Sequence, residues 1–187
     1  MAKFNNETLH PGEQFFYSGI SFICLDVVGG NYLAMTSAPY RELPFDTENC
    51  NDWRKSSLRG TLNTEFLRLL DKKHLVRQVS NLVADNGDKS YGTCEDYVTI
   101  LSYDQYRKYR DIVPLFDEWM WTLTPWTCSA GHGYRVRYVN SFGNLHYYYA
   151  VDRIGVAPVC LFSSENLTLH RQTTLEGGIE HDKPENG

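Results

Sequence analysis

The chain of 187 residues contains no apolar run approaching the ~20 residues that a membrane-spanning helix needs. Residues 1–15 include no apolar stretch suited to a signal peptide. An excess of positive charge is also missing, because 18 Lys and Arg stand against 23 Asp and Glu, for a formal net charge of −5. Binding to nucleic acid depends on neutralising phosphates with basic residues. We therefore expect a soluble protein, made in a cytoplasm without a signal peptide, that does not bind nucleic acid directly.

Cysteines are few, odd in number and scattered, and no two form a C-x-x-C pair. This spacing gives no zinc signature and no dense disulfide framework, so we expect small buried side chains in a reducing compartment. The chain also lacks the G-x-S-x-G and H-E-x-x-H motifs and a phosphate-binding glycine loop. We therefore predict that the protein is not an enzyme and holds no metal or cofactor. The five cysteines are Cys24, Cys50, Cys94, Cys128 and Cys160.

Aromatic residues are abundant, at 14% of the chain with 13 Tyr, and many of them lie between residues 126 and 152. This segment is bracketed by two apolar stretches, 121–126 and 154–159, which are typical of a rigid framework. Tyrosine offers a large, stiff contact area at little entropic cost, while Asn, Ser and Gly provide adaptable hydrogen bonds. The pattern indicates a recognition surface on a stable scaffold, although an aromatic β core with tyrosine hydroxyls in water is an equally good interpretation.

The spacing of apolar residues predicts an α+β fold. Apolar residues three and four apart predict an amphipathic helix over 56–70, capped by Ser56 or Ser57, and a short helical turn over 71–74. A second helix is expected over 102–112, capped by Ser102. Residues 37–51 are expected to form a loop, and 75–83 fit either a strand or irregular chain. The predicted strands are 13–28 with a break near Ser18–Gly19, 32–36, 97–101, and the hairpin 135–139 with 145–150. The chain from Trp119 onward is expected to consist of strands and loops.

The last part of the chain changes in composition after residue 162. Residues 163–187 contain few apolar and many polar side chains, which is typical of a peripheral extension. We therefore predict one domain over 1–162 followed by a polar C-terminal extension over 163–187.

A conspicuous motif runs from Trp53 to Phe66, WRKSSLRGTLNTEF. It resembles the W-x-x-S-x-L-R-x-x-L-N-x-x-F signature of an uncharacterised domain family from Gram-positive gut bacteria and their phages. The segments 100–102 (ILS), 121–125 (WTLTP) and 155–158 (GVAP) are similar to later motifs of that family, in the same order. The resemblance spans about residues 13–162.

The resemblance implies a C-type-lectin-like fold of the formylglycine-generating-enzyme type, with small twisted antiparallel sheets and two flanking helices. Phage and bacterial members of that superfamily include proteins that vary residues in the corresponding C-terminal segment. It also implies a phage or prophage origin, and hence a location in the host cytoplasm or the virion. Neither Cys128 nor Cys160 stands in a context resembling the cysteine pair of the oxidase, and the calcium motifs of lectins are absent. The motif residues 53–66 themselves are expected to be structural.

The candidate binding residues belong to the Tyr-rich segment 126–152. Because side chains alternate along a strand, Leu145, Tyr147 and Tyr149 should face one way, and His146, Tyr148 and Ala150 the other. Only some of these tyrosines can therefore be exposed together. We expect the partner, a protein or a glycan, to contact a surface drawn from Trp126, His132, Tyr134, Arg135, Arg137, Tyr138, Asn140, Asn144, His146, Tyr148 and Asp152.

Several alternatives remain open at this stage. A small acidic phage protein would suit an intracellular inhibitor of a host defence nuclease, of the anti-CRISPR type, because acidic patches compete for basic grooves. An exposed aromatic face would also suit a structural virion protein that forms homo-oligomers. A formylglycine-generating type of oxidase is the weakest alternative, since it would have to rely on Cys128 and Cys160.

Overall fold

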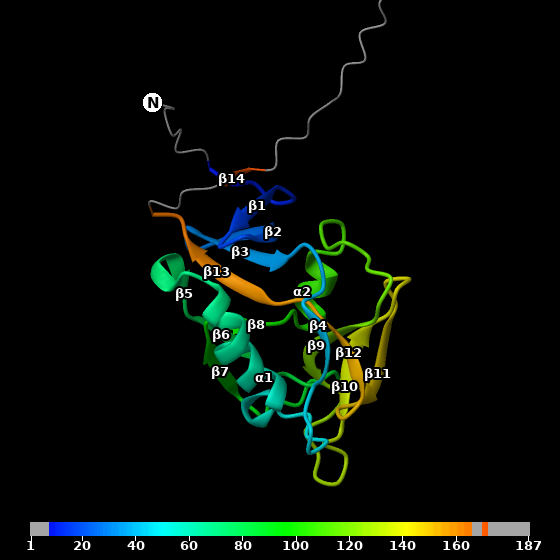
Figure 1. Cartoon of the computed structure of the whole chain (residues 1–187). Coiled ribbons are helices and arrows are strands. Elements are labelled where there is room, and N and C mark those ends of the chain that lie inside the picture. The colour runs from blue at the N-terminus through cyan, green and yellow to red at the C-terminus, as the bar shows by residue number, and fades with distance from the viewer. Residues whose placement is uncertain (1–7, 166–169, 172–187) are drawn as a thin grey trace, which may run out of the picture.

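The computed structural model describes residues 8–165 and 170–171, which form two antiparallel-rich sheets packed around one helical segment (Figure 1). The α+β class is confirmed. The larger, seven-stranded sheet contains β1 (Gln14–Tyr17), β2 (Ile20–Val28), β3 (Asn31–Thr36), β5 (Leu75–Val76), β8 (Val98–Thr99), β13 (Val159–Ser163) and β14 (His170–Arg171). The five-stranded sheet has the order β11 (Leu145–Tyr149), β10 (Arg135–Val139), β9 (Met120–Pro125), β12 (Arg153–Val156) and β4 (Arg41–Pro44). A separate hairpin joins β6 (Gln78–Asn81) to β7 (Thr93–Asp96).

The N-terminal strands follow the predicted pattern, including the break near residue 18. Ser18 and Gly19 both have positive φ, 51° and 79°, so the chain turns tightly there between β1 and β2. Gly29 and Gly30 do the same between β2 and β3. Positive φ is a conformation that glycine adopts without steric cost. The turn chemistry therefore sets the register of this meander.

The predicted helix over 56–70 is confirmed as a run of consecutive helical turns between the two sheets. It consists of α1 (Ser57–Thr61), a π-helical turn η2 (Leu62–Phe66) and a 3₁₀ turn η3 (Leu67–Leu69). The Ser56 hydroxyl caps the start by accepting from the Arg59 N–H at 3.1 Å. Two short 3₁₀ turns, η1 (Trp53–Lys55) and η4 (Lys72–His74), flank this run, and the second of these was predicted.

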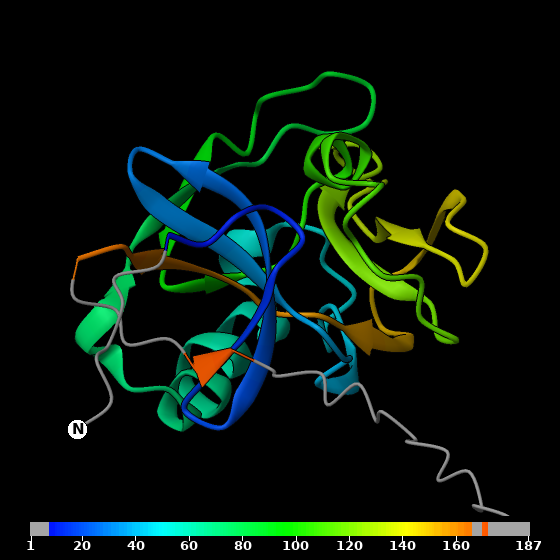
Figure 2. The same ribbon diagram turned by 90° about the horizontal axis from the view of Figure 1, so that it is seen from above.

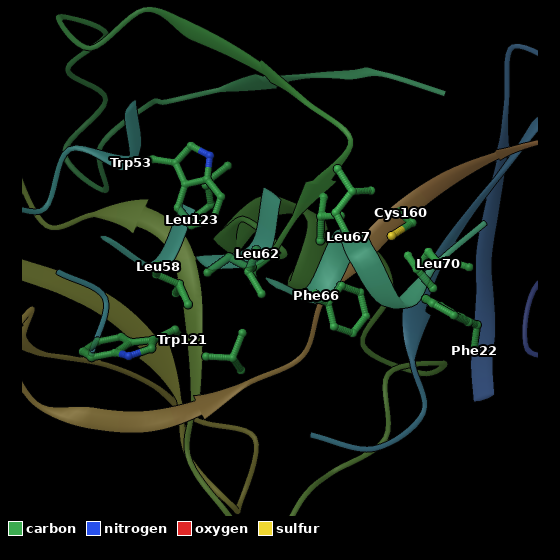
Figure 3. Packing of buried hydrophobic residues seen from close by; sticks show 14 of the residues in the cluster. Phe22, Trp53, Leu58, Leu62, Phe66, Leu67, Leu70, Trp121, Leu123 and Cys160 are labelled. Atoms are coloured by element: carbon green, nitrogen blue, oxygen red, sulfur yellow. The ribbon is translucent and has the colours of Figure 1, made fainter. Parts of the chain in front are cut away.

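The helical run fills the space between the sheets. Figure 3 shows Leu58 near Trp121 of β9 at one end of the cluster, and Leu70 near Phe22 of β2 at the other. Leu62 and Phe66 lie between them and are almost completely buried. One apolar face thus contributes to both sheets at once, which explains why the spacing of three and four is so regular.

The Trp53–Phe66 motif is structural, as predicted. The Trp53 indole donates to Asp96 Oδ2 at 3.0 Å, and the Arg59 guanidinium donates to the same buried carboxylate at 2.9 Å. The hydrogen bond to Asp96 raises the pKa of Arg59, so this arginine stays charged. Asn63 pairs with both backbone groups of Val98, accepting from N at 3.1 Å and donating to O at 2.9 Å. Trp53, Arg59 and Asn63 therefore all direct polar groups to partners within the fold.

The second helix, α2 (Tyr103–Lys108), begins where predicted. Ser102 and Gln105 form a reciprocal capping box, with each side chain bonded to the other residue's backbone. Helix α2 ends at residue 108, earlier than the predicted 112, and a turn follows it.

Three short strands lie where none was predicted. β4 falls in the expected loop 37–51 and pairs with β12 through its backbone. Its charged residues Arg41 and Glu42 gave no apolar pattern from which a strand could be predicted. β7 pairs with β6 although Thr93–Asp96 is polar. β14 lies in the predicted polar extension and pairs with β1.

Residues 153–163 join the two sheets. β12 lies between β9 and β4, and runs parallel to β9, whereas the other strand pairs are antiparallel. β13 follows directly and enters the larger sheet between β3 and the β5 and β8 strands. Within residues 8–165 and 170–171, no helix is long and apolar enough to cross a membrane.

Candidate interaction surface

The hairpin β10–β11 forms one margin of the five-stranded sheet and carries most of the predicted binding residues (Figure 1). Its register places Arg135 opposite Tyr149 and Arg137 opposite Tyr147. Since side chains alternate, these four share the outer face of the hairpin. Tyr147 and Tyr149 are 45% and 46% exposed, so this face meets solvent with aromatic rings.

Arg135 lies among four rings on this outer face. Its guanidinium carbon is 4.9 Å from the ring centroids of both Trp126 and Tyr147, 5.2 Å from Tyr134 and 5.8 Å from Tyr149. Attraction between a cation and an aromatic face holds such a stack in one geometry. We call Trp126, Tyr134, Arg135, Arg137, Tyr147 and Tyr149 the arginine–aromatic cluster.

Within residues 8–165 and 170–171, no acidic side chain balances the charge of Arg135. Among the described residues it takes part in no ion pair, and its buried Nε has no hydrogen-bond partner. A buried donor without a partner carries a free-energy cost. The cluster therefore combines a cation that forms no ion pair among the described residues with exposed aromatic rings.

Arg137 is differently placed, because it pairs with Asp85. Its guanidinium carbon is 5.5 Å from the rings of both Tyr103 and Tyr147. Tyr103, on α2, donates its hydroxyl to the backbone carbonyl of His146 at 2.9 Å. Burial raises the pKa of Tyr103 above its usual value, so it remains a donor at neutral pH. Helix α2 thus fixes the hairpin from the side.

The opposite face of the hairpin is largely turned toward the core. Val136 is fully buried and Tyr138 is only 6% exposed, so Tyr138, although predicted to bind a partner, contributes little to the surface. Burial raises the pKa of the Tyr138 hydroxyl. Trp119 covers Tyr138 with a stacked ring 4.8 Å away and meets Tyr148 edge-on at 5.8 Å. On this side, exposed aromatic area comes from Trp119, Tyr148 and His146 at the rim.

His132 and Trp126 lie together at the end of the hairpin, with ring centroids 6.2 Å apart. They line a hollow of about 300 Å³ that reaches Asp85, the partner of Arg137. His132 is exposed, as predicted for a residue flanked by glycines. The hollow adjoins the arginine–aromatic cluster through Trp126. Its remaining lining residues are Asn86, Thr127 and Ser129.

The other predicted residues shape turns. The Asn140 side-chain oxygen accepts from the backbone N–H of Phe142 at 3.0 Å and of Asn144 at 2.9 Å, which closes the β10–β11 turn. The Asp152 backbone N–H donates to Tyr149 at 3.0 Å in the turn after β11. The structure therefore brings Trp126, His132, Tyr134, Arg135 and Arg137 together, and leaves His146 and Tyr148 on the opposite face.

Sequence reasoning missed Tyr103 and Asp85, which lie 43 and 52 positions from their partners His146 and Arg137, respectively. Both line a groove of about 700 Å³ between the β6–β7 hairpin and α2. The capping box at Ser102 locates the start of α2, but no local signal shows which strand the helix contacts.

Cys160 and Cys128, the two cysteines on which an oxidase would depend, lie in different environments. Cys160 is fully enclosed in β13, where burial strongly raises the pKa of its thiol. Cys128 lies in the loop after β9, with its sulfur 3.9 Å from the Asp88 carbonyl. Among residues 8–165 and 170–171, no group of three or more His, Cys, Asp or Glu side chains is placed to hold a metal ion.

Comparison of the chain with family models, with curated protein sequences and with solved structures gave no match.

Proposed function

We propose that the protein is a non-enzymatic binding protein that recognises a protein partner through the arginine–aromatic cluster. The observation that carries this proposal is Arg135, an arginine held among four rings with no acidic partner among the described residues. Fully paired arginines, such as Arg59 with Asp96, serve the fold. An arginine that the rings hold in place and that forms no ion pair among the described residues is suited to pair with an acidic group of a partner.

The composition of the cluster supports a protein partner. Residues that dominate binding energy at protein interfaces are enriched in Trp, Tyr and Arg, which are the residue types of this cluster. Its rings are held by mutual contacts, including Tyr134 stacked on Tyr149 at 5.8 Å and Trp126 beside Tyr147 at 5.7 Å. Binding to a rigid surface loses less side-chain entropy than binding to a mobile one.

We further propose that the scaffold is C-type-lectin-like and that the gene is phage- or prophage-borne. What supports this is the order of the motifs 53–66, 121–125 and 155–158, together with two antiparallel-rich sheets and short helices. In this arrangement the scaffold keeps the framework residues buried, and the Tyr-rich segment 126–152 forms the binding surface.

The test is capture of a partner from the host. The purified full chain is incubated with host extract and, separately, with intact host cells, and captured proteins are identified by mass spectrometry. We expect the double variant Trp126→Ala/Tyr147→Ala to capture at least tenfold less of a protein that the wild type captures specifically. A cytoplasmic nuclease as the captured protein would favour the intracellular inhibitor, and a cell-surface protein or glycan would favour a display role.

A matched control uses two other exposed apolar residues. Val27 and Val28, at the tip of the β2–β3 hairpin in the larger sheet, are 43% and 46% exposed. Val27→Ala/Val28→Ala should leave capture unchanged. Equal capture by wild type, cluster variant and control, with all three folded by circular dichroism, would refute the proposal.

A further inference from the structure

Among the described residues, strand β11 has a neighbouring strand on one side only. It ends the order of the five-stranded sheet, and the hairpin that carries it stands away from the larger sheet when the molecule is seen from above (Figure 2). The Ala150 N–H donates to the Tyr134 carbonyl at 2.9 Å, which fixes the hydrogen-bonding phase of the ladder. Because bonded and non-bonded pairs alternate, the N–H groups of Leu145 and Tyr147 point away from β10. β11 therefore offers backbone groups to an additional strand.

The two edges of this sheet are built differently. β4, at the other end, reads R-E-L-P, so it carries two charges and a proline. Charged residues and proline are the usual protection of an edge against pairing with other chains. β11 reads L-H-Y-Y-Y, with no charge, proline, glycine or bulge against β10. The sequence protects one edge and leaves the other open.

Aromatic side chains flank the open edge on both faces. Tyr147 and Tyr149 stand on the outer face, and Tyr148, 39% exposed, stands on the inner face with Trp119. A strand that pairs with an edge gains affinity from backbone hydrogen bonds, and gains specificity from contacts with alternate side chains. The exposed rings provide such contacts above and below the plane of the sheet.

From this arrangement, and resting on the function proposed above, we infer that the partner binds by adding an extended, acidic segment as a sixth strand beside β11. The acidic character follows from Arg135, which lies over Tyr147 and Tyr149 and forms no ion pair within the part of the chain that the structure describes. Neighbouring strands are about 4.8 Å apart, so an added strand lies roughly 10 Å from β10. Long Arg and Glu side chains span that distance together across the tyrosine rings.

A second copy of the chain fits the same edge less well. Antiparallel pairing of two β11 strands would place the outer faces of both copies on the same side of the joined sheet. Arg135 and Arg137 of each copy would then lie on one surface, while β11 offers no carboxylate in return. Like charges brought together oppose such pairing. An acidic strand from another protein supplies what the edge lacks.

The probe for this inference is a displayed library of random dodecapeptides, selected on the immobilised full chain. We expect enriched peptides to alternate apolar and other residues and to contain Asp or Glu. The tightest synthetic peptide should bind Arg135→Gln at least tenfold more weakly by calorimetry, whereas Arg41→Gln, at the β4 edge, should bind as wild type does.

Backbone methylation of the peptide tests strand pairing without altering the protein. In an added strand, the N–H groups of alternate residues point toward β11 and those of the other residues point away from it. N-methylation of the first set should abolish binding, and N-methylation of the second set should change the affinity only a fewfold. Tolerance of both sets, or indifference to Arg135→Gln, would overturn the inference. Selective binding of oligothymidylate in place of acidic peptides, or a dimer in sedimentation that Tyr148→Lys dissociates, would overturn it as well.

Hydrogen exchange on the captured partner complex separates this inference from the proposed function. Protection of the Leu145 and Tyr147 amides on binding would support strand addition. Capture that depends on Trp126 and Tyr147, without protection of those amides, would leave the binding function standing and refute the sixth strand.

Discussion

Two regions of this molecule, residues 53–66 and the β10–β11 hairpin, are rich in polar and aromatic residues. In the first region several of these side chains point into the fold, and in the second several of them point toward solvent. In the Trp53–Phe66 region the polar groups turn inward: Asp96 receives Trp53 and Arg59, and Asn63 bonds both backbone groups of Val98. In the β10–β11 hairpin, Arg135 forms no ion pair with any described residue, and Tyr147 and Tyr149 face solvent. A conspicuous sequence motif is therefore no guide to function until it is known whether its hydrogen bonds are complete.

The comparison is tested most strongly by Asp96→Ala. This change leaves the Trp53 N–H and the Arg59 guanidinium without their shared acceptor inside the core. Removing one partner of a buried pair costs several kcal/mol, and since Arg59 is partly exposed we expect a loss of about 3 kcal/mol in the free energy of unfolding. Urea denaturation followed by tryptophan fluorescence measures it. A loss below about 1 kcal/mol would show that the network is dispensable.

A smaller effect is expected at Tyr103, which links α2 to the hairpin. Tyr103→Phe removes the bond to the His146 carbonyl and should cost about 1 kcal/mol at pH 7. Burial raises the folded-state pKa of Tyr103, so its stabilisation is complete below the unfolded value of about 10 and is lost as pH rises above it. The gap between wild type and Tyr103→Phe in urea midpoints should therefore narrow above pH 10. A constant gap would contradict the assignment.

The hairpin tyrosines should affect stability even less. Tyr147 and Tyr149 are about half exposed, so Tyr147→Ala/Tyr149→Ala is expected to lower the free energy of unfolding by less than about 1 kcal/mol. Thermal unfolding of the purified variant gives the value. A loss as large as that of Asp96→Ala would mean that the hairpin rings hold the fold, and the contrast between the two regions would disappear.

The smallest effect is expected at Glu65, in the helical run itself. Glu65 pairs with Arg41 at 3.2 Å, but both side chains are more than half exposed. Exposed ion pairs contribute about 0–1 kcal/mol, so Glu65→Gln should change stability by about 0.5 kcal/mol or less in urea. A larger loss would show that position in the helical region, rather than burial, determines the importance of a charge.

Local signals in the sequence were sufficient for much of the fold. Ser56 and Ser102 cap helices through bonds that reach only three residues, so their positions are readable from the sequence. Asp96 was missed as the acceptor for Trp53 because 43 residues separate them. β4 and β7 were missed because their side chains are largely polar, and only pairing with another strand defines them.

For the candidate site, the sequence predicted the segment and the alternation of side chains, but not which face is outward. The period of two correctly separates Tyr147 and Tyr149 from His146 and Tyr148. Which set meets solvent depends on what packs beneath the sheet, and Trp119 and the core cover the face of Tyr138. That information belongs to tertiary contacts, so Tyr138 was expected at the surface and lies inside.

The joining of both sheets by residues 153–163 has a consequence during synthesis. β12 completes one sheet between β4 and β9, and β13 completes the other beside β3. The strands synthesised earlier can therefore pair fully only after residues 153–163 have been synthesised. Neither sheet can close until this segment has left the ribosome. Long-range pairing of this kind slows folding and exposes apolar surface meanwhile. We expect nascent chains that end before residue 153 to need chaperones. We expect the open β11 edge to be the part of these chains that associates most readily with other chains.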